Sequence, residues 1–235
     1  LYTFFGIDPY LAVPMVAAVM FVLGAGIQHT LITPSLGTKS FTNLLFLTVG
    51  LGLLLSNGAL VIFGSEYRSI RTAYSQTYIP MGPVTISLPR MISFGVLIVV
   101  TIALFAFLKY TTVGKQIRAV SQNPVGAEVV GIDVKKIYLL TYGLGVALAG
   151  TAGALLTQFY TIFPPAGASF GFRALIVVVV GGLGSIPGAF LAGIFLGLLE
   201  TMSALFISPS YSDLIVFMTF IVILVVRQTV IARRK

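Results

Sequence analysis

Few residues in this sequence have the type and spacing that a catalytic site requires. The six acidic residues are scattered rather than paired: Asp8, Glu66, Glu128, Asp133, Glu200 and Asp213. No serine has a histidine and an acidic partner that spacing would propose. The chain has no cysteine and one histidine, His29, which excludes thiolate chemistry and clusters of cysteine or histidine ligands. We expect no catalytic site, no metal and no cofactor.

A glycine-rich run, GGLGSIPG, occupies residues 181–188. It lacks the Gly-Lys-Ser/Thr ending of a phosphate-binding loop, so ATP would have to be hydrolysed by another polypeptide. Ser185 is expected to cap a following helix that has Pro187 in its first turn. Irregular backbone at membrane depth is tolerated only where protein or a water-filled cavity covers it. We therefore place the run inside a bundle and take as pathway candidates Gly181, Gly182, Gly184, Ser185 and Gly188.

A polar segment, residues 114–133, contains signals for a helix start and stop. Asn123 followed by Pro124 predicts an N-cap and first helical position, and Gly131 predicts the stop. The resulting helix, Pro124–Val130, is too short to hold alone in water. Its apolar side chains would need a partner surface: Val125, Val129, Val130 and Ile132. The residues leave two interpretations open, a connector lying on the membrane or a docking element.

Two polar residues fall within apolar segments. Glu200 is a functional candidate because charges inside a membrane are costly; alternatively it snorkels to the interface or pairs structurally. Asn57, beside Ser56, is expected to form a hydrogen bond with another helix, with pathway lining as the alternative.

The composition indicates an integral membrane protein. The 235 residues are 57% hydrophobic and only 9% charged, and the mean hydropathy is +1.06, whereas a soluble domain has about 25% charged residues. The net charge of +8 is spread in short stretches rather than over one continuous face. The expected partner is therefore membrane lipid and not nucleic acid.

A bilayer core of about 30 Å needs about 20 apolar residues in a helix. We predict spans at Tyr10–Ile27, Phe41–Phe63, Met91–Leu108 and Ile137–Phe159, a broken region at Ala174–Phe206, and a last segment from about Asp213 to Val230.

Basic residues indicate how the broken region runs. The loop Lys109–Lys136 holds five and the C-terminus four, which places both in the cytoplasm. If Ala174–Phe206 crossed the membrane once, this loop and the C-terminus would lie on opposite sides of it. A turn at the glycines, as a short arm followed by a longer helix, keeps ten of the fourteen basic residues inside, counting Lys39. The prediction is an all-α, polytopic membrane helix bundle with a glycine-broken segment.

Two further patterns predict local structure. Small residues repeat every four positions at Gly145, Ala149 and Gly153, and again at Ala189, Gly193 and Gly197. We expect these stripes to pack helices closely within the subunit, with a subunit interface or gate as the alternative. Residues 81–88 combine a turn signal with alternation, which predicts a short β-hairpin outside the membrane.

Two motifs resemble those of branched-chain amino acid importer permeases. One is RAVSQNP at 118–124 with GID at 131–133, and the other is GGLGSIPGA at 181–189. The resemblance extends over essentially the whole chain and is strongest to the first, H-type permease of that system. The two motifs together are quite specific to the family, and either alone would be weaker.

The resemblance implies one transmembrane permease domain over residues 1–235, with a cytoplasmic coupling loop at 109–136, in a bacterial or archaeal cytoplasmic membrane. It also implies two ATPase subunits, a second related permease and an external amino-acid-binding protein. Family members begin with further hydrophobic segments, so we expect about 50–60 residues before Leu1 to be missing. The residues implied to couple to the ATPase are Arg118, Ala119, Gln122, Asn123, Pro124, Ala127, Gly131 and Ile132.

These features predict a subunit, not an enzyme, that moves branched-chain or other hydrophobic amino acids by alternating access. A permease for urea or short amides is the alternative within the same class. An ion-coupled secondary transporter would need a charged residue in mid-membrane, for which only Glu200 is close. A membrane scaffold without transport is the remaining rival.

Overall fold

The computed structural model describes residues 8–36, 41–67, 77–81 and 84–232. It divides into two compact units, Leu1–Pro164 and Pro165–Lys235, and each is described by itself. Whether both belong to the single permease domain expected from the sequence stays a prediction. Lys39, Arg233, Arg234 and Lys235, used above to count charges, lie outside the described residues.

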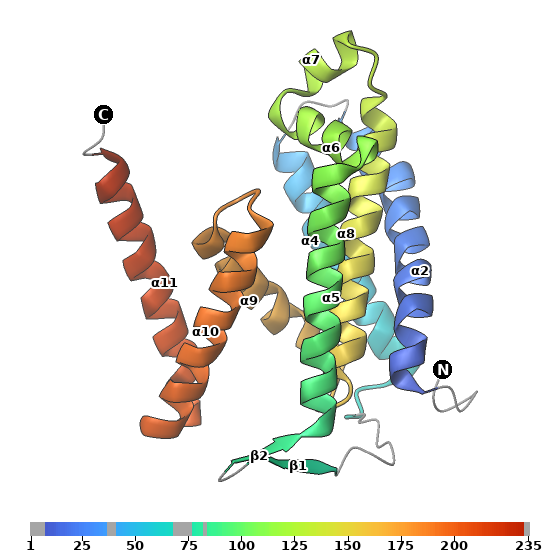
Figure 1. Ribbon diagram of the computed structural model, residues 1–235. Helices are drawn as coiled ribbons and strands as arrows, with labels where there is room; N and C mark the ends of the chain where they lie inside the picture. Colours follow the sequence, from blue (N-terminus) through green and yellow to red (C-terminus); the bar gives the residue numbers. More distant parts are fainter. Residues whose placement is uncertain (1–7, 37–40, 68–76, 82–83, 233–235) are drawn as a thin grey trace. The chain divides into compact units, whose positions relative to one another are not determined.

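Long apolar helices form the first unit (Figure 1). Helix α2, Pro9–Ile27, begins where the Asp8 carboxylate accepts a hydrogen bond from the Tyr10 N–H at 3.0 Å. It continues without interruption through a π-helical turn, η1 (Gln28–Ile32), into α3 (Thr33–Leu36). Helices α4 (Phe41–Phe63), α5 (Leu88–Tyr110) and α8 (Val134–Leu156) complete the long segments.

Glycines pack α2 against α8. A Cβ added at Gly24 would lie 2.7 Å from Val146 Cβ, and one at Gly150 would lie 2.5 Å from Met20 Cγ. Neither Gly145 nor Gly153 would meet anything within 4 Å. The expectation that the 145–149–153 stripe packs the helices is therefore wrong for these two glycines, because the contact surface lies on a neighbouring face of α8.

A β-hairpin precedes α5, as predicted. Strands β1 (Tyr78–Met81) and β2 (Val84–Ser87) pair antiparallel, with Tyr78 opposite Ser87. The turn residues Gly82 and Pro83 lie outside the described residues. The Tyr10 hydroxyl donates to the Pro89 carbonyl at 2.9 Å, which joins the start of α2 to the start of α5 beside the hairpin.

Three helices form the second unit: α9 (Ala166–Gly181), α10 (Ile186–Phe206) and α11 (Pro209–Ala232). Ile176, Leu196 and Val216, one from each helix, form its buried core. The predicted break is confirmed, with a shorter helix before the glycines and a longer one after them. Helix α9 begins eight residues earlier than predicted, because the apolar run that we used as a signal starts only after Ser169 and Arg173.

Within the described residues, five helices are long and apolar enough to cross a membrane: Pro9–Ser35, Thr42–Phe63, Leu88–Tyr110, Val134–Leu156 and Ile186–Phe206. The first is longer than the predicted Tyr10–Ile27, because η1 carries the helix on past the polar residues at 28–30. Shorter apolar helices occur at Ala166–Gly181 and Tyr211–Val226. An all-α polytopic membrane bundle is confirmed.

Candidate functional site

Two short helices cap the end of the first unit between α5 and α8 (Figure 1). Helix α6, Thr112–Gln122, and helix α7, Pro124–Val129, meet at Asn123. Val120, Ala127 and Ile137, from α6, α7 and α8, are buried together. Ile117, Ile132, Val134 and Tyr138 pack around them. We call these seven residues, with the helices they join, the α6–α7 platform.

The platform holds α7 by one face and leaves the other face open. Ala127 is 4% exposed, whereas Val125, Val129 and Val130 are 70%, 83% and 74% exposed. The expectation that Ile132 is also exposed is wrong, because it packs against the buried cluster. Ala127 thus anchors this short helix, and the three valines form an exposed apolar surface.

The local sequence explains where α7 begins and ends. The Asn123 side-chain oxygen accepts a hydrogen bond from the Gly126 N–H at 2.9 Å, and Pro124 takes the first helical position. Helix α7 ends at Val129, one residue before the predicted Val130. Gly131 follows with φ +85°, and the Ile132 N–H donates to the Ala127 carbonyl at 3.0 Å. The N-cap, first position and glycine stop predicted from the sequence are confirmed.

Asp133 begins the next helix. Its carboxylate accepts from the Lys136 N–H at 3.1 Å and pairs with the Lys136 ammonium at 3.1 Å. The backbone hydrogen bond from Lys136 is the main reason why the pKa of Asp133 lies below its ordinary value. The cap is therefore charged at neutral pH, and its stabilisation is lost only as the pH falls through that lowered pKa.

Sequence reasoning missed α6. The Thr111 hydroxyl accepts from the Gly114 N–H at 3.0 Å, and a Cβ at Gly114 would lie 2.5 Å from the Leu108 carbonyl oxygen. The Arg118 guanidinium donates to that same carbonyl. A threonine cap followed by apolar residues at 113, 117 and 120 was the available signal. Arg118 therefore fixes the α5–α6 corner, while Gln122 is exposed and Ala119 is half-buried.

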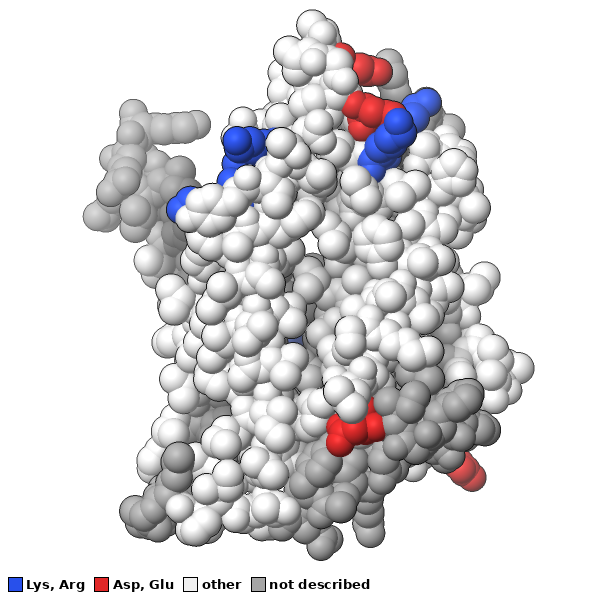
Figure 2. Space-filling model, turned by 45° about the vertical axis from the view of Figure 1, so that its right-hand side comes forward, with Lys and Arg blue, Asp and Glu red and all other residues white. Residues whose placement is uncertain are grey.

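Charged side chains on the face shown in Figure 2 gather at the end that carries this platform and at the opposite end, with an almost uncharged surface between them. Lys115, Arg118, Glu128, Asp133, Lys135 and Lys136 all belong to α6, α7 and the start of α8. Charged groups at the ends of the helices and few between them are typical of a membrane protein.

In the second unit, the glycine break is a tight turn. Gly182 and Gly184 have φ values of +92° and +87°, which side chains with a Cβ rarely adopt. Gly181 and Gly188 instead allow contact between the two helices: a Cβ at Gly188 would lie 2.0 Å from the Gly181 carbonyl oxygen. The Ser185 hydroxyl caps α10 by accepting from the Gly188 N–H at 3.1 Å. All five residues singled out from sequence thus shape one turn.

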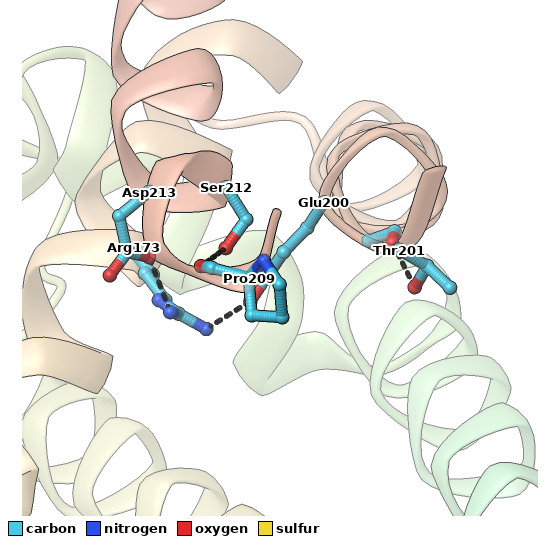
Figure 3. Close-up of polar contacts among 7 residues, drawn as sticks. Arg173, Glu200, Thr201, Pro209, Ser212 and Asp213 are labelled. Atoms are coloured by element: carbon cyan, nitrogen blue, oxygen red, sulfur yellow. Dashed lines mark hydrogen bonds and ion pairs between the residues drawn. The ribbon is translucent and has the colours of Figure 1, made fainter. Parts of the chain in front are cut away.

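Glu200 forms part of a charge cluster across the three helices of this unit (Figure 3). Arg173 Nη1 lies 2.8 Å from Glu200 Oε1, and Arg173 Nη2 lies 2.5 Å from Asp213 Oδ1. Of the two readings of Glu200, the structural pair is the one observed. Sequence reasoning missed Arg173, although one arginine within an apolar helix was a signal that could have revealed it.

Asn57 does not make the interhelical bond that we expected. Its Nδ2 donates to the Leu53 carbonyl of the same helix at 2.8 Å, and the side chain is exposed. An exposed amide can always find the carbonyl one turn earlier, so its presence does not specify a partner helix. In the part of the chain that the structure describes, no group of three or more His, Cys, Asp or Glu could hold a metal ion.

Comparison with known proteins places these features in a family. Residues 1–224 match the family described as branched-chain amino acid transport system / permease component. The permease protein LivH of the high-affinity branched-chain amino acid transport system of Escherichia coli (strain K12) is 37% identical over 134 residues, 57% of this chain and 44% of the relative. BraD of the corresponding system of Pseudomonas aeruginosa is 31% identical over 191 residues, 79% of this chain and 62% of the relative.

An archaeal relative matches more of the sequence. The probable branched-chain amino acid transport permease protein LivH of Methanocaldococcus jannaschii is 30% identical over 215 residues, 88% of this chain and 67% of the relative. The chain thus spans about half to two thirds of the length of these relatives. No solved structure matches it. With its apolar helices and this match over nearly all its length, the chain is a multi-pass membrane protein that belongs to the family of branched-chain amino acid transport permease components.

Proposed function

We propose that this chain is the permease subunit of an ATP-driven importer for branched-chain or other hydrophobic amino acids. Two separate ATPase subunits would hydrolyse the ATP, and a second related permease and an external binding protein would complete the assembly. The cytoplasmic membrane of a bacterium or archaeon is the proposed location. The family and the names of the relatives support the substrate class.

The observation that carries the proposal is the exposed valine face of α7. Three exposed apolar side chains, two on a helix of six residues and one at the residue that follows it, are costly to leave in water, and they suit a cleft in a partner subunit. Because Ala127 and Ile132 join α7 to Ile137 of α8, a partner that moves α7 also moves α8. This connection provides a physical route from ATP-driven motion to the membrane helices, as alternating access requires.

The proposal predicts which substitutions should affect the ATPase. Val129→Arg places a charge on the exposed face without touching the buried cluster, so the permease should insert normally but lose ATPase co-purification and ATP-dependent leucine uptake in vesicles. Tyr110→Arg is a matched control, because Tyr110 is also largely exposed, at the end of α5, but lies outside α7. Full ATPase association and normal uptake by Val129→Arg would refute the docking role.

The structure disfavours an ion-coupled mechanism. An ion-coupled transporter needs a membrane carboxylate that is free to bind and release the ion, but Glu200 is already paired with Arg173. Uptake by the intact assembly should stop when ATP is depleted and persist when an uncoupler is added with ATP maintained.

The substrate class is tested by competition against the uptake of labelled leucine. Inhibition of this uptake by urea or acetamide would favour the short-amide alternative, whereas inhibition by isoleucine and valine alone supports the proposal.

A further inference from the structure

A cavity of about 520 Å³ opens between the α2–η1 segment and α8 in the first unit. Gln28 and Ile32 of η1 lie on one side, and Tyr138, Tyr142, Gly145 and Ala149 of α8 lie on the other. The volume lies within the range of about 300–1,000 Å³ typical of small-molecule sites. Gly145 and Ala149 belong to the predicted small-residue stripe, and the space beside Gly145 is open, because a Cβ there would meet nothing within 4 Å.

Gln28 gives this cavity a buried polar group. Its side chain is only 3% exposed, and its Nε2 donates to Thr33 Oγ1 over a long 3.4 Å. A buried amide is unfavourable unless its hydrogen bonds are made, and a donor–acceptor distance of 3.4 Å is too long for a strong one. A polar group in the cavity would therefore find an amide to bind. The π-helical turn that starts at Gln28 supports the same conclusion, because such turns occur frequently at functional sites.

The remaining walls define the chemistry of the occupant. They are aliphatic or aromatic apart from Thr141 and the tyrosine hydroxyls, and no charged residue of the described chain lines the cavity. The Thr141 hydroxyl already donates to the Ile137 carbonyl at 2.7 Å. An amide can accept from an ammonium group and donate to a carboxylate. The cavity therefore suits a solute with an apolar side chain and one small polar end, held without a strong ion pair.

We propose that this cavity is a transit site for the transported solute, a zwitterionic amino acid with an aliphatic side chain. The inference rests on the proposed function and adds to it a binding site and the residues that select the substrate. Tyr138 lines the cavity and also packs against the buried cluster of the α6–α7 platform. A shift of α7 would thus change the cavity wall, which links docking at one surface to release at the site.

The test uses the assembled importer in vesicles, energised with ATP and supplied with leucine, isoleucine, valine or alanine. Gly145→Val adds bulk where a Cβ meets nothing within 4 Å, so the fold can accept it. It should lower uptake of leucine and isoleucine about tenfold more than uptake of alanine, since methylene-sized changes in apolar pockets discriminate by about that factor or more. Gly153→Val is the control, because Gly153 lies in the same stripe with equal space but does not line the cavity.

A second variant, Gln28→Leu, tests the polar end. It should raise the KM for all four amino acids alike and leave their order unchanged. An unchanged selectivity in Gly145→Val, or an equal loss in Gly145→Val and Gly153→Val, would overturn the transit site. Loss of the second permease from purified Gly145→Val would also overturn it and assign the cavity to a subunit interface. Absence of uptake of any of the four by the unsubstituted assembly would instead refute the proposed function itself.

Discussion

The ion pairs of Arg173 change how the neighbouring carboxylates are interpreted. Taken alone, Glu200 is a carboxylate inside an apolar helix and therefore a candidate for ion coupling. Arg173 joins it to Asp213, and the side chains of Arg173 and Glu200 are 36% and 32% exposed, compared with 75% for Asp213. The inner pair is thus the better shielded one, and it connects α9 to α10 within the second unit.

Arg173→Gln should destabilise the protein more than Glu200→Gln does. The first change leaves two carboxylates without their cation, whereas the second leaves Arg173 with Asp213. We expect a loss of about 1–3 kcal/mol for Arg173→Gln, between the values for exposed and for buried pairs. Melting temperatures in detergent measure the difference. A melting temperature for Arg173→Gln equal to that of the unsubstituted protein would show that the cluster contributes nothing to stability.

The structure also changes the predicted role of Ala127. The family resemblance implies that Ala127 couples to the ATPase, which would make Ala127→Arg a test of docking. The structure buries it between Val120 and Ile137, so Ala127→Arg would disrupt the platform itself and could not separate docking from folding. The exposed valines Val125 and Val129 are the positions that separate the two.

At the scale of the elements, glycine acts in two physically different ways. In α2 and α8, it removes side chains so that the helices approach closely. In the break, Gly181 and Gly188 do the same, while Gly182 and Gly184 provide backbone conformations with positive φ. A side chain at Gly184 would not overpack its surroundings, because a Cβ there meets nothing within 4 Å; the constraint at this position is its positive φ.

Gly24→Ala should weaken the contact between α2 and α8. Its methyl group would lie 2.7 Å from Val146 Cβ and 3.2 Å from the Gly143 Cα, an overpacking cost of about 1–3 kcal/mol. Gly26→Ala, in the same helix with nothing within 4 Å, should be neutral or stabilise by about 0.5–1 kcal/mol through helix propensity. Thermal unfolding in detergent compares them. Equal melting temperatures for the two variants would refute the packing role of Gly24.

The two kinds of glycine in the break should respond differently to alanine and asparagine. Gly188→Ala would place a Cβ 2.0 Å from the Gly181 carbonyl oxygen, so the turn must open and folded protein should be lost. At Gly184, alanine should cost about 1–2 kcal/mol, the penalty of a left-handed backbone, and asparagine less. Yield of monodisperse protein in detergent measures both. Normal yield of Gly188→Ala would contradict the close contact.

At the scale of the whole molecule, the charge distribution and the hydrophobic spans predict which ends face the cytoplasm. Helix α5 runs from the β-hairpin to α6, and the platform carries the basic residues Lys115, Arg118, Lys135 and Lys136. The Tyr10–Pro89 hydrogen bond places the start of α2 at the hairpin end of the first unit. The positive-inside rule then assigns the platform to the cytoplasm and the hairpin to the outside.

Single cysteines in this cysteine-free chain test that assignment. Thr85→Cys, in the exposed hairpin strand, should react with an impermeant thiol reagent in intact cells. Ser121→Cys, exposed in α6, should react only after the membrane is opened or in inverted vesicles. Labelling of Ser121→Cys from outside intact cells would reverse the orientation and remove the basis for ATPase docking at α7.

The sequence by itself determined the class of protein, the helical spans, the break at 181–185, the hairpin and the caps of α7 and α10. These features depend on composition, on apolar length and on residues within a few positions of one another. Only the tertiary structure decided which face of each helix makes contact. In the structure, Ala127 and Ile132 pack in the cluster between α6, α7 and α8. Gly150, rather than Gly145, makes the close contact of α8. Glu200 pairs with Arg173, which lies 27 positions earlier. A helix that is apolar on all sides has no sequence signal for its contact face, because lipid and protein interior select the same side chains.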